Sequence, residues 1–235
     1  MSDAAPQARV TESPRERPVL YDVDVAVAGA GLCGTFAAIA AGRCGARTVL
    51  IDRFGSVGGN LGPGMVVNGG VFREADTTLP GGLSGLAREF VEQLLSLRVG
   101  PADRYPEDSG ICSQVAYEML RQAGVELLLG LLVCSRGAGY LRRGHDPTGM
   151  RARPSMMVFG QCVGTAAALT ALDGTTPRGV DLKKVQQRLL ADGIVLGEPE
   201  RLRRLGLAES TPRSAPARSA ARRDRGVCRK GGGST

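Results

Sequence analysis

The sequence has no tryptophan, few other aromatic residues and a single histidine, His145. Aromatic residues make up only 4% of the 235 residues, which argues against a surface that stacks nucleic-acid bases. One histidine with scattered cysteines gives no ligand spacing for zinc, so no metal site is expected. His145 stands in a turn rich in glycine and arginine, where we expect it to be exposed, and the sequence identifies no catalytic acid or base.

Paired cysteines are also absent. The six cysteines form no CxxC motif or tight cluster; they are Cys33, Cys44, Cys112, Cys134, Cys162 and Cys228. Disulfide-exchanging enzymes and iron–sulfur proteins both need closely grouped thiols, so neither class is favoured. Lone cysteines, together with an N-terminus that has no apolar signal-peptide core, lead us to expect a cytoplasmic protein.

Long hydrophobic runs are missing as well. The longest, Leu127 to Cys134, is far shorter than the roughly 20 residues that a membrane-spanning helix needs. We therefore expect no membrane insertion.

Positive charge is concentrated at one end of the chain. The net charge is +7, but residues 201–235 hold ten Lys or Arg and two Asp or Glu, so the first 200 residues sum to −1. Residues 1–19 and the basic stretch 201–235 lack hydrophobic periodicity, and we expect both to be disordered tails. A nucleic-acid-binding arm is the alternative for the basic tail, but a solvated extension, or sequence from an altered reading frame, is favoured.

The strongest positive signal lies between Asp24 and Asn60. An apolar strand runs into GAGLCG at residues 29–34, an alanine-rich helix follows, and a second strand ends at Asp52. This order of strand, glycines, helix, strand and acid is the dinucleotide-binding βαβ fingerprint. Its glycines permit a tight turn, a close approach of the backbone to a pyrophosphate and close helix packing, and the helix N-terminus favours an anion. The Asp52 carboxylate is placed to accept hydrogen bonds from ribose hydroxyls.

A second glycine-rich loop follows the acid directly, in the segment DRFGSVGGN over residues 52–60. A nicotinamide-binding unit has no general need for glycines at this point. An extended FAD, by contrast, lays its pyrophosphate and ribityl chain across such a loop. The segment therefore favours FAD and leaves a small NAD(P)-binding protein as an alternative.

With this loop the chain resembles the FAD-dependent oxidoreductases of the glutathione-reductase-like superfamily. More narrowly, it resembles the heterodisulfide reductase A-like flavoproteins, which have a DRxGxxGGN-like segment after the first βαβ unit. The PGGL segment and the helix after it, residues 80–91, also resemble that family. So does GQCVGTAAAL at residues 160–169, which matches a G-Q-x-x-G-T-A-A-A-L segment in relatives.

The resemblance implies a set of FAD contacts. The first glycine turn would hold the pyrophosphate, the acid the adenosine ribose, the second loop the extended chain, and a later strand the adenine. In relatives the N-terminus of the helix at the GQ segment points at the pyrimidine end of the flavin, where a positive helix end stabilises the reduced ring. The implied FAD-binding residues are Gly29, Gly31, Gly34, Asp52, Arg53, Gly59, Asn60, Val133, Gly160, Gln161 and Gly164.

Alternating strands and helices predict an α/β fold, a Rossmann-like FAD-binding βαβ domain with a parallel sheet. We expect one truncated domain over residues 20–200, internally shortened near 135–150, where relatives have a substrate-facing part. Asp181 is the predicted N-cap of the last helix, and Gly193 its end. The expected strands are 23–28, 47–51, 125–129 and 131–134, and the expected helices are 32–43, 82–97, 111–123, about 160–173 and 181–192.

Two functions from different classes follow, beside the NAD(P) alternative. The first is an FAD-dependent oxidoreductase that uses the flavin for hydride or electron transfer, with an unknown substrate or electron-transfer partner. The second is a catalytically inactive flavoprotein remnant, because the missing scaffold would leave an open sheet edge and an exposed core.

Overall fold

A three-stranded parallel sheet forms the base of the fold in the computed structural model, which describes residues 19–65, 82–97, 109–131 and 153–207. Its strands, in spatial order, are β1 (Val25–Ala28), β2 (Thr48–Asp52) and β3 (Glu126–Leu129). Leu50 of the central strand pairs with Val27 on one side and Leu127 on the other. This topology confirms the predicted α/β fold with a βαβ start and a parallel sheet.

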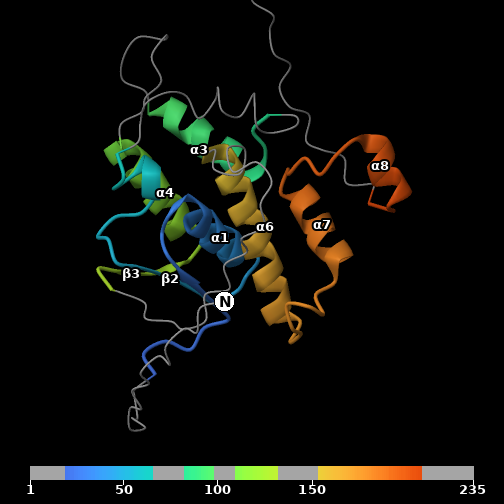
Figure 1. Ribbon diagram of the computed structural model, residues 1–235, viewed down its shortest axis with the longest axis horizontal. Coiled ribbons are helices and arrows are strands. Elements are labelled where there is room, and N and C mark those ends of the chain that lie inside the picture. Colours follow the sequence, from blue (N-terminus) through green and yellow to red (C-terminus); the bar gives the residue numbers. More distant parts are fainter. Residues whose placement is uncertain (1–18, 66–81, 98–108, 132–152, 208–235) are drawn as a thin grey trace, which may run out of the picture.

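Four helices gather on one side of this sheet (Figure 1). They are α1 (Leu32–Arg43), α3 (Gly85–Ser96), α4 (Ser109–Gln122) and α6 (Arg153–Leu172). Apolar side chains from all four helices pack with strand residues such as Leu50 into one main core. Within it, Phe36 of α1 meets Phe90 of α3 edge to face, with the ring centroids 5.5 Å apart. The core therefore joins parts of the chain that are distant in sequence.

Helices α1 and α6 lie side by side, with small residues at their contact (Figure 1). A Cβ added to Gly160 would overlap the carbonyl oxygen of Cys33, and one added to Gly164 would overlap that of Ala37. Glycine at these two positions lets the helix backbones approach more closely than any side chain would permit. These small residues therefore pack α6 tightly against another helix.

Helix α7 (Leu182–Ala191) packs on the far side of α6 from α1 (Figure 1). Asp181 caps it by accepting a hydrogen bond from the Lys183 amide at 2.9 Å, and Gly193 follows its end with φ of +82°. Both features were predicted. The contact with α6 is a second apolar cluster built on Leu169, Val185, Leu189 and Ile194.

One predicted boundary is wrong at the C-terminal end. Residues from 201 onward were expected to be a disordered tail, but α8 (Pro199–Arg204) forms there and Leu207 is buried. The Leu207 amide donates to the carbonyl oxygen of Leu202 at 2.9 Å, which ends the helix. The prediction failed because α8 is too short to show a hydrophobic period. The remaining parts of the two predicted tails, residues 1–18 and 208–235, lie outside the described residues.

The helix expected at about 160–173 begins earlier, at Arg153. The sequence analysis took the GQ segment as its start, whereas Pro154 stands in the first turn, where a proline suits a helix. The helices predicted at 32–43 and 181–192 are found within one residue at each end. The strand expected at 131–134 and the shortened region near 135–150 fall largely outside the described residues.

Helix α6 is long and apolar enough to cross a membrane by length and composition alone, with 20 residues and a mean hydropathy of 1.4. The sequence analysis missed this because it considered only uninterrupted apolar runs. In the structure, α6 packs against α1, α3 and α7. Among the described residues it is therefore placed as a core helix of the domain.

Candidate functional site

The first glycine turn has the geometry that its sequence predicts. Gly29 adopts φ of +102°, a left-handed conformation that favours glycine, and its amide donates to the Ile51 carbonyl at 2.7 Å. A Cβ on Gly34 would overlap the carbonyl oxygen of Gly29, so α1 can leave the turn at this angle only with glycine there. The Thr35 hydroxyl, in the first turn of α1, donates to the Ala30 carbonyl at 3.0 Å and so connects the helix to the turn.

The space in front of Gly31 is open. A Cβ added to Gly31 would meet no atom within 4 Å, and Gly31 is the N-cap of α1 without any side-chain hydrogen bond to the helix. The start of the helix is therefore open on the side of the Gly31 Cβ position, with the positive end of the helix dipole behind it. An anionic group such as a diphosphate fits this cradle.

Asp52, at the end of β2, lies directly beside this turn. One carboxylate oxygen accepts a hydrogen bond from the Ala30 amide, and the other accepts one from the Phe54 amide at 2.7 Å. Two backbone donors thus fix the carboxylate next to the glycines. Each oxygen has a second lone pair, so the carboxylate can still accept bonds from vicinal hydroxyls such as those of a ribose.

The second glycine loop packs onto the first. The Gly58 amide donates to the Ala30 carbonyl at 2.9 Å, and Gly59 adopts φ of +56°. A Cβ on Gly59 would lie 2.7 Å from the Cα of Gly31, so the loops touch at the start of α1. Asn60 is exposed within a short 3₁₀ turn, η1 (Gly59–Leu61). The structure therefore brings together the site residues that were predicted in the two loops.

A serine pair that the sequence analysis missed supports the second loop. The Ser113 hydroxyl on α4 donates to the Val57 carbonyl at 2.8 Å and accepts from the Ser56 hydroxyl at 3.1 Å. No local pattern marks Ser113, since its partner lies far away in sequence. The loop, α4 and β3 border an open hollow of about 370 Å³, lined by Gly55, Ser56, Val57, Ser113, Gln114, Tyr117 and Leu129.

Three further residues named from the sequence, Arg53, Val133 and His145, are not placed at the contact between the two glycine loops. Arg53 is exposed and lies over the ring of Phe54, with the guanidinium carbon 4.6 Å from the ring centroid. Val133, the predicted adenine position, lies outside the described residues, as does His145. No group of three or more His, Cys, Asp or Glu that could hold a metal ion occurs in the described ranges.

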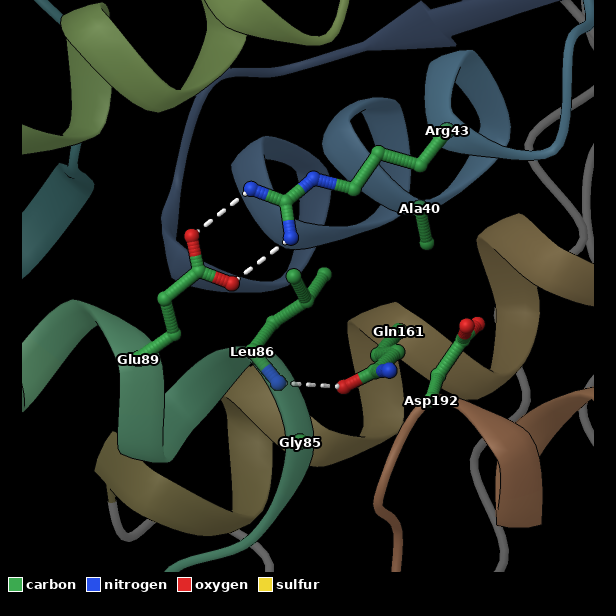
Figure 2. A pocket seen from close by; sticks show the side chains of 7 residues that line it. All are labelled: Ala40, Arg43, Gly85, Leu86, Glu89, Gln161 and Asp192. Atoms are coloured by element: carbon green, nitrogen blue, oxygen red, sulfur yellow. Dashed lines mark hydrogen bonds and ion pairs between the residues drawn. The ribbon is translucent and has the colours of Figure 1, made fainter. Parts of the chain in front are cut away.

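The expectation that a helix N-terminus lies at Gly160 and Gln161 is wrong. Because α6 begins at Arg153, both residues stand inside the helix. Gly160 and Gly164 face α1, while the side chain of Gln161 points toward α3 and is only 1% exposed. Its Oε1 accepts a hydrogen bond from the Leu86 amide at 2.9 Å, as Figure 2 shows. In this structure Gln161 connects two helices.

Figure 2 shows a small pocket beside the Gln161 side chain, bounded by α1, α3, α6 and the end of α7. Arg43 closes one side through two hydrogen bonds to the Glu89 carboxylate, at 2.6 and 2.7 Å. The side-chain hydrogen bond with Glu89 raises the pKa of Arg43. The pocket measures about 120 Å³, well below the roughly 300–1,000 Å³ of typical ligand sites. We interpret it as a structural junction.

Replacing Gln161 by methionine tests whether this residue connects α6 to α3. The change keeps much of the volume but removes the acceptor for the buried Leu86 amide, so we expect a loss of about 1–3 kcal/mol in the free energy of unfolding. Chemical denaturation checks this. The flavin content of the folded protein should not change; a variant that loses flavin at unchanged stability would return Gln161 to the cofactor site.

Two half-buried cysteines lie on different helices: Cys33 at the start of α1, and Cys162 on α6 beside the apolar cluster shared with α7. Burial raises the pKa of the Cys33 thiol, and burial likewise raises that of Cys162. Both side chains are therefore protonated at neutral pH, and a thiol is a poor nucleophile compared with a thiolate. Both residues therefore act as small packing groups in this structure.

The chain is similar to known flavin-family proteins over part of its length. The sequence model of the family described as "FAD dependent oxidoreductase" matches residues 24–142. The tRNA uridine 5-carboxymethylaminomethyl modification enzyme MnmG of Rhodopirellula baltica is 42% identical over 93 residues, which are 37% of this chain and 14% of that enzyme. The mitochondrial 5-taurinomethyluridine-[tRNA] synthase subunit MTO1 of Mus musculus is 36% identical over 104 residues, which are 40% of this chain and 15% of that protein.

The chain therefore spans about one seventh of the length of these curated relatives. Among solved structures, the one described as "Crystal structure of AlpK" has a TM-score of 0.26 and 18% sequence identity, and the match covers 48% of this chain and 24% of that chain.

Proposed function

Because the chain belongs to the FAD-dependent oxidoreductase family, we propose that it binds FAD across its two glycine loops and uses the flavin for hydride or electron transfer. One observation carries the proposal. The uncapped start of α1 opens onto free space at Gly31, and the fixed carboxylate of Asp52 stands beside it. A dinucleotide needs these two features side by side, one for its diphosphate and one for its ribose.

The residues of this chain would bind and orient the cofactor. The first amides of α1 would hold the pyrophosphate, and Asp52 would accept bonds from the adenosine ribose. Gly59 and Asn60 would line the path of the extended chain, because their loop lies against Gly31. Bound flavin would supply the redox chemistry. The hollow between the second loop and α4 begins at Gly55, three residues after Asp52 in the sequence, and its volume of about 370 Å³ is large enough for a purine ring.

The relatives set the limit of this proposal. Their names describe modification of a uridine in tRNA, but the matched segment covers only about one seventh of each. The remaining six sevenths of each relative lie outside the matched segment. We therefore propose flavin binding and flavin redox chemistry and name no substrate.

The direct test is the absorption spectrum of the purified protein, followed by release and identification of its cofactor. We expect a flavin band and FAD in near one-to-one yield, or uptake of added FAD to that level. A folded, colourless protein that takes up no FAD would support the inactive remnant. Retention of NAD(P) in its place would support the nicotinamide alternative.

Replacing Asp52 by asparagine tests the ribose contact separately. Hydrogen bonds to a charged group contribute about 1.5–3 kcal/mol, so we expect FAD to bind roughly 10–150 times more weakly. FMN lacks the adenosine ribose, and its weaker affinity should not change. Titration of apoprotein with both flavins measures this difference. Equal losses for FAD and FMN would contradict the assigned contact.

A further inference from the structure

The surplus positive charge of the chain begins on an ordered helix that the cofactor site does not use. Residues 201–235 hold ten Lys or Arg, while the first 200 residues sum to a net charge of −1. The structure places the first three of these cations, Arg201, Arg203 and Arg204, on α8, where all three are exposed. The sequence analysis had assigned this charge to a disordered tail alone.

The arginines of α8 are not neutralised by ion pairs within the described residues. Elsewhere in those residues, Arg43, Arg47 and Arg121 are each bound to a carboxylate, as are Lys184 and Arg188 on α7. Arg203 and Arg204 form no such pair there. The exposed Lys183 adds a further cation to this surface, since a Cβ on Gly206, just past the end of α8, would lie 3.4 Å from its Nζ. Two acids, Glu198 and Glu200, stand at the opposite end of the helix, so the cations dominate its C-terminal half.

We propose that the C-terminal half of α8, together with Lys183, binds the phosphate backbone of a double-helical nucleic acid. Guanidinium groups offer planar pairs of donors that match phosphate oxygens, and exposed unpaired cations gain affinity by releasing counterions from the duplex. Residues 182–207, which form α7, α8 and their connection, include no aromatic side chain that could stack on unpaired bases, which favours a duplex over a single strand.

A membrane surface fits this helix less well. An interfacial helix inserts a continuous apolar face, whereas α8 has six residues and Leu202 as its single apolar side chain beyond the proline at its start. Leu205 follows the helix and is half exposed. One or two leucines bury too little apolar area to hold a protein at a bilayer.

The proposed surface is separate from the cofactor site. Figure 1 shows α8 beside α7, on the side of α6 that faces away from α1 and the sheet. Binding of a duplex there needs no flavin, so the two proposals can fail independently.

The test is the salt dependence of duplex binding by the full chain. We would titrate a mixed-sequence double-stranded RNA and a matched DNA by fluorescence anisotropy between about 50 and 200 mM salt. Replacing Arg203 and Arg204 by glutamine should make the slope of log K against log salt shallower by about 2, since each lost phosphate contact removes about 0.9. Replacing both by lysine should retain most of the slope, because the charge is kept.

The control removes the same net charge elsewhere. Arg47→Gln with Arg121→Gln eliminates two cations that are already paired with Asp24 and Glu118, and the slope should hardly change. Circular dichroism and FAD content show that each variant is folded. Equal losses in the two double variants, or an unchanged slope in the Arg203 and Arg204 variant, would overturn the proposal. Stronger binding to anionic lipid vesicles than to either duplex would overturn it as well.

Discussion

Replacing Gly164 by alanine is expected to lower the free energy of unfolding by about 3 kcal/mol, the upper end of the usual cost of overpacking a core. The new Cβ would overlap the carbonyl oxygen of Ala37 and lie 2.7 Å from its Cα. These are backbone atoms of a neighbouring helix, so they cannot rotate away as a side chain would. Helices α1 and α6 would have to separate, and the apolar side chains around them would lose contact.

Urea denaturation monitored by circular dichroism measures this effect. Gly55→Ala is the matched control, because a Cβ there meets no atom within 4 Å and its backbone is not left-handed. The control should change the free energy of unfolding by less than about 0.5 kcal/mol. A Gly164 variant as stable as the Gly55 variant would show that α1 and α6 are not in close contact.

Replacing Gly31 by valine is expected to abolish FAD binding while leaving the apoprotein intact. Gly31 has φ of −67° and ψ of 174°, an extended conformation open to any residue, and its missing Cβ faces free space. The valine side chain would fill the space that we assign to the pyrophosphate. We expect the affinity for FAD to fall at least about 100-fold, which corresponds to about 2.7 kcal/mol.

The measurement is titration of apoprotein with FAD, followed by flavin fluorescence. Unfolding of the apoprotein provides the control and should change by less than about 0.5 kcal/mol. Gly31→Ala places a smaller group in the same space and should give an intermediate loss. A Gly31→Val protein that binds FAD at full affinity would place the cofactor elsewhere and contradict the proposed function.

The first half of the site could be predicted from the sequence because it is built from neighbours. Strand, turn, helix, second strand and acid lie between residues 25 and 52, and each role follows from local backbone needs. Gly29 needs a left-handed φ, and Gly34 needs contact with the preceding turn. Both requirements are visible in the spacing of the glycines alone.

The rest of the arrangement depends on contacts that no local pattern encodes. Gln161 was placed near the flavin by analogy, but its partner is the amide of Leu86, on a helix from another part of the chain. The role of Ser113 was not predicted either, because its hydrogen-bond partner, the Val57 carbonyl, is distant in sequence. Pro154 is a local signal for the early start of α6. The resemblance to the flavoprotein family favoured a start at the GQ segment instead.

The contact between α1 and α6 also affects folding of the protein during its synthesis. Helix α1 emerges from the ribosome early, but the glycines that complete its surroundings, Gly160 and Gly164, are synthesised much later. Until then the alanine-rich face of α1 stays without its partner, whereas the glycine turn at its start already has its hydrogen-bond partners, all of which lie before residue 59. Contacts between such distant segments slow folding and prolong the exposure of apolar surface. The nascent chain would therefore expose this apolar face of α1 until synthesis reaches α6, although the residues of the proposed cofactor site are made long before.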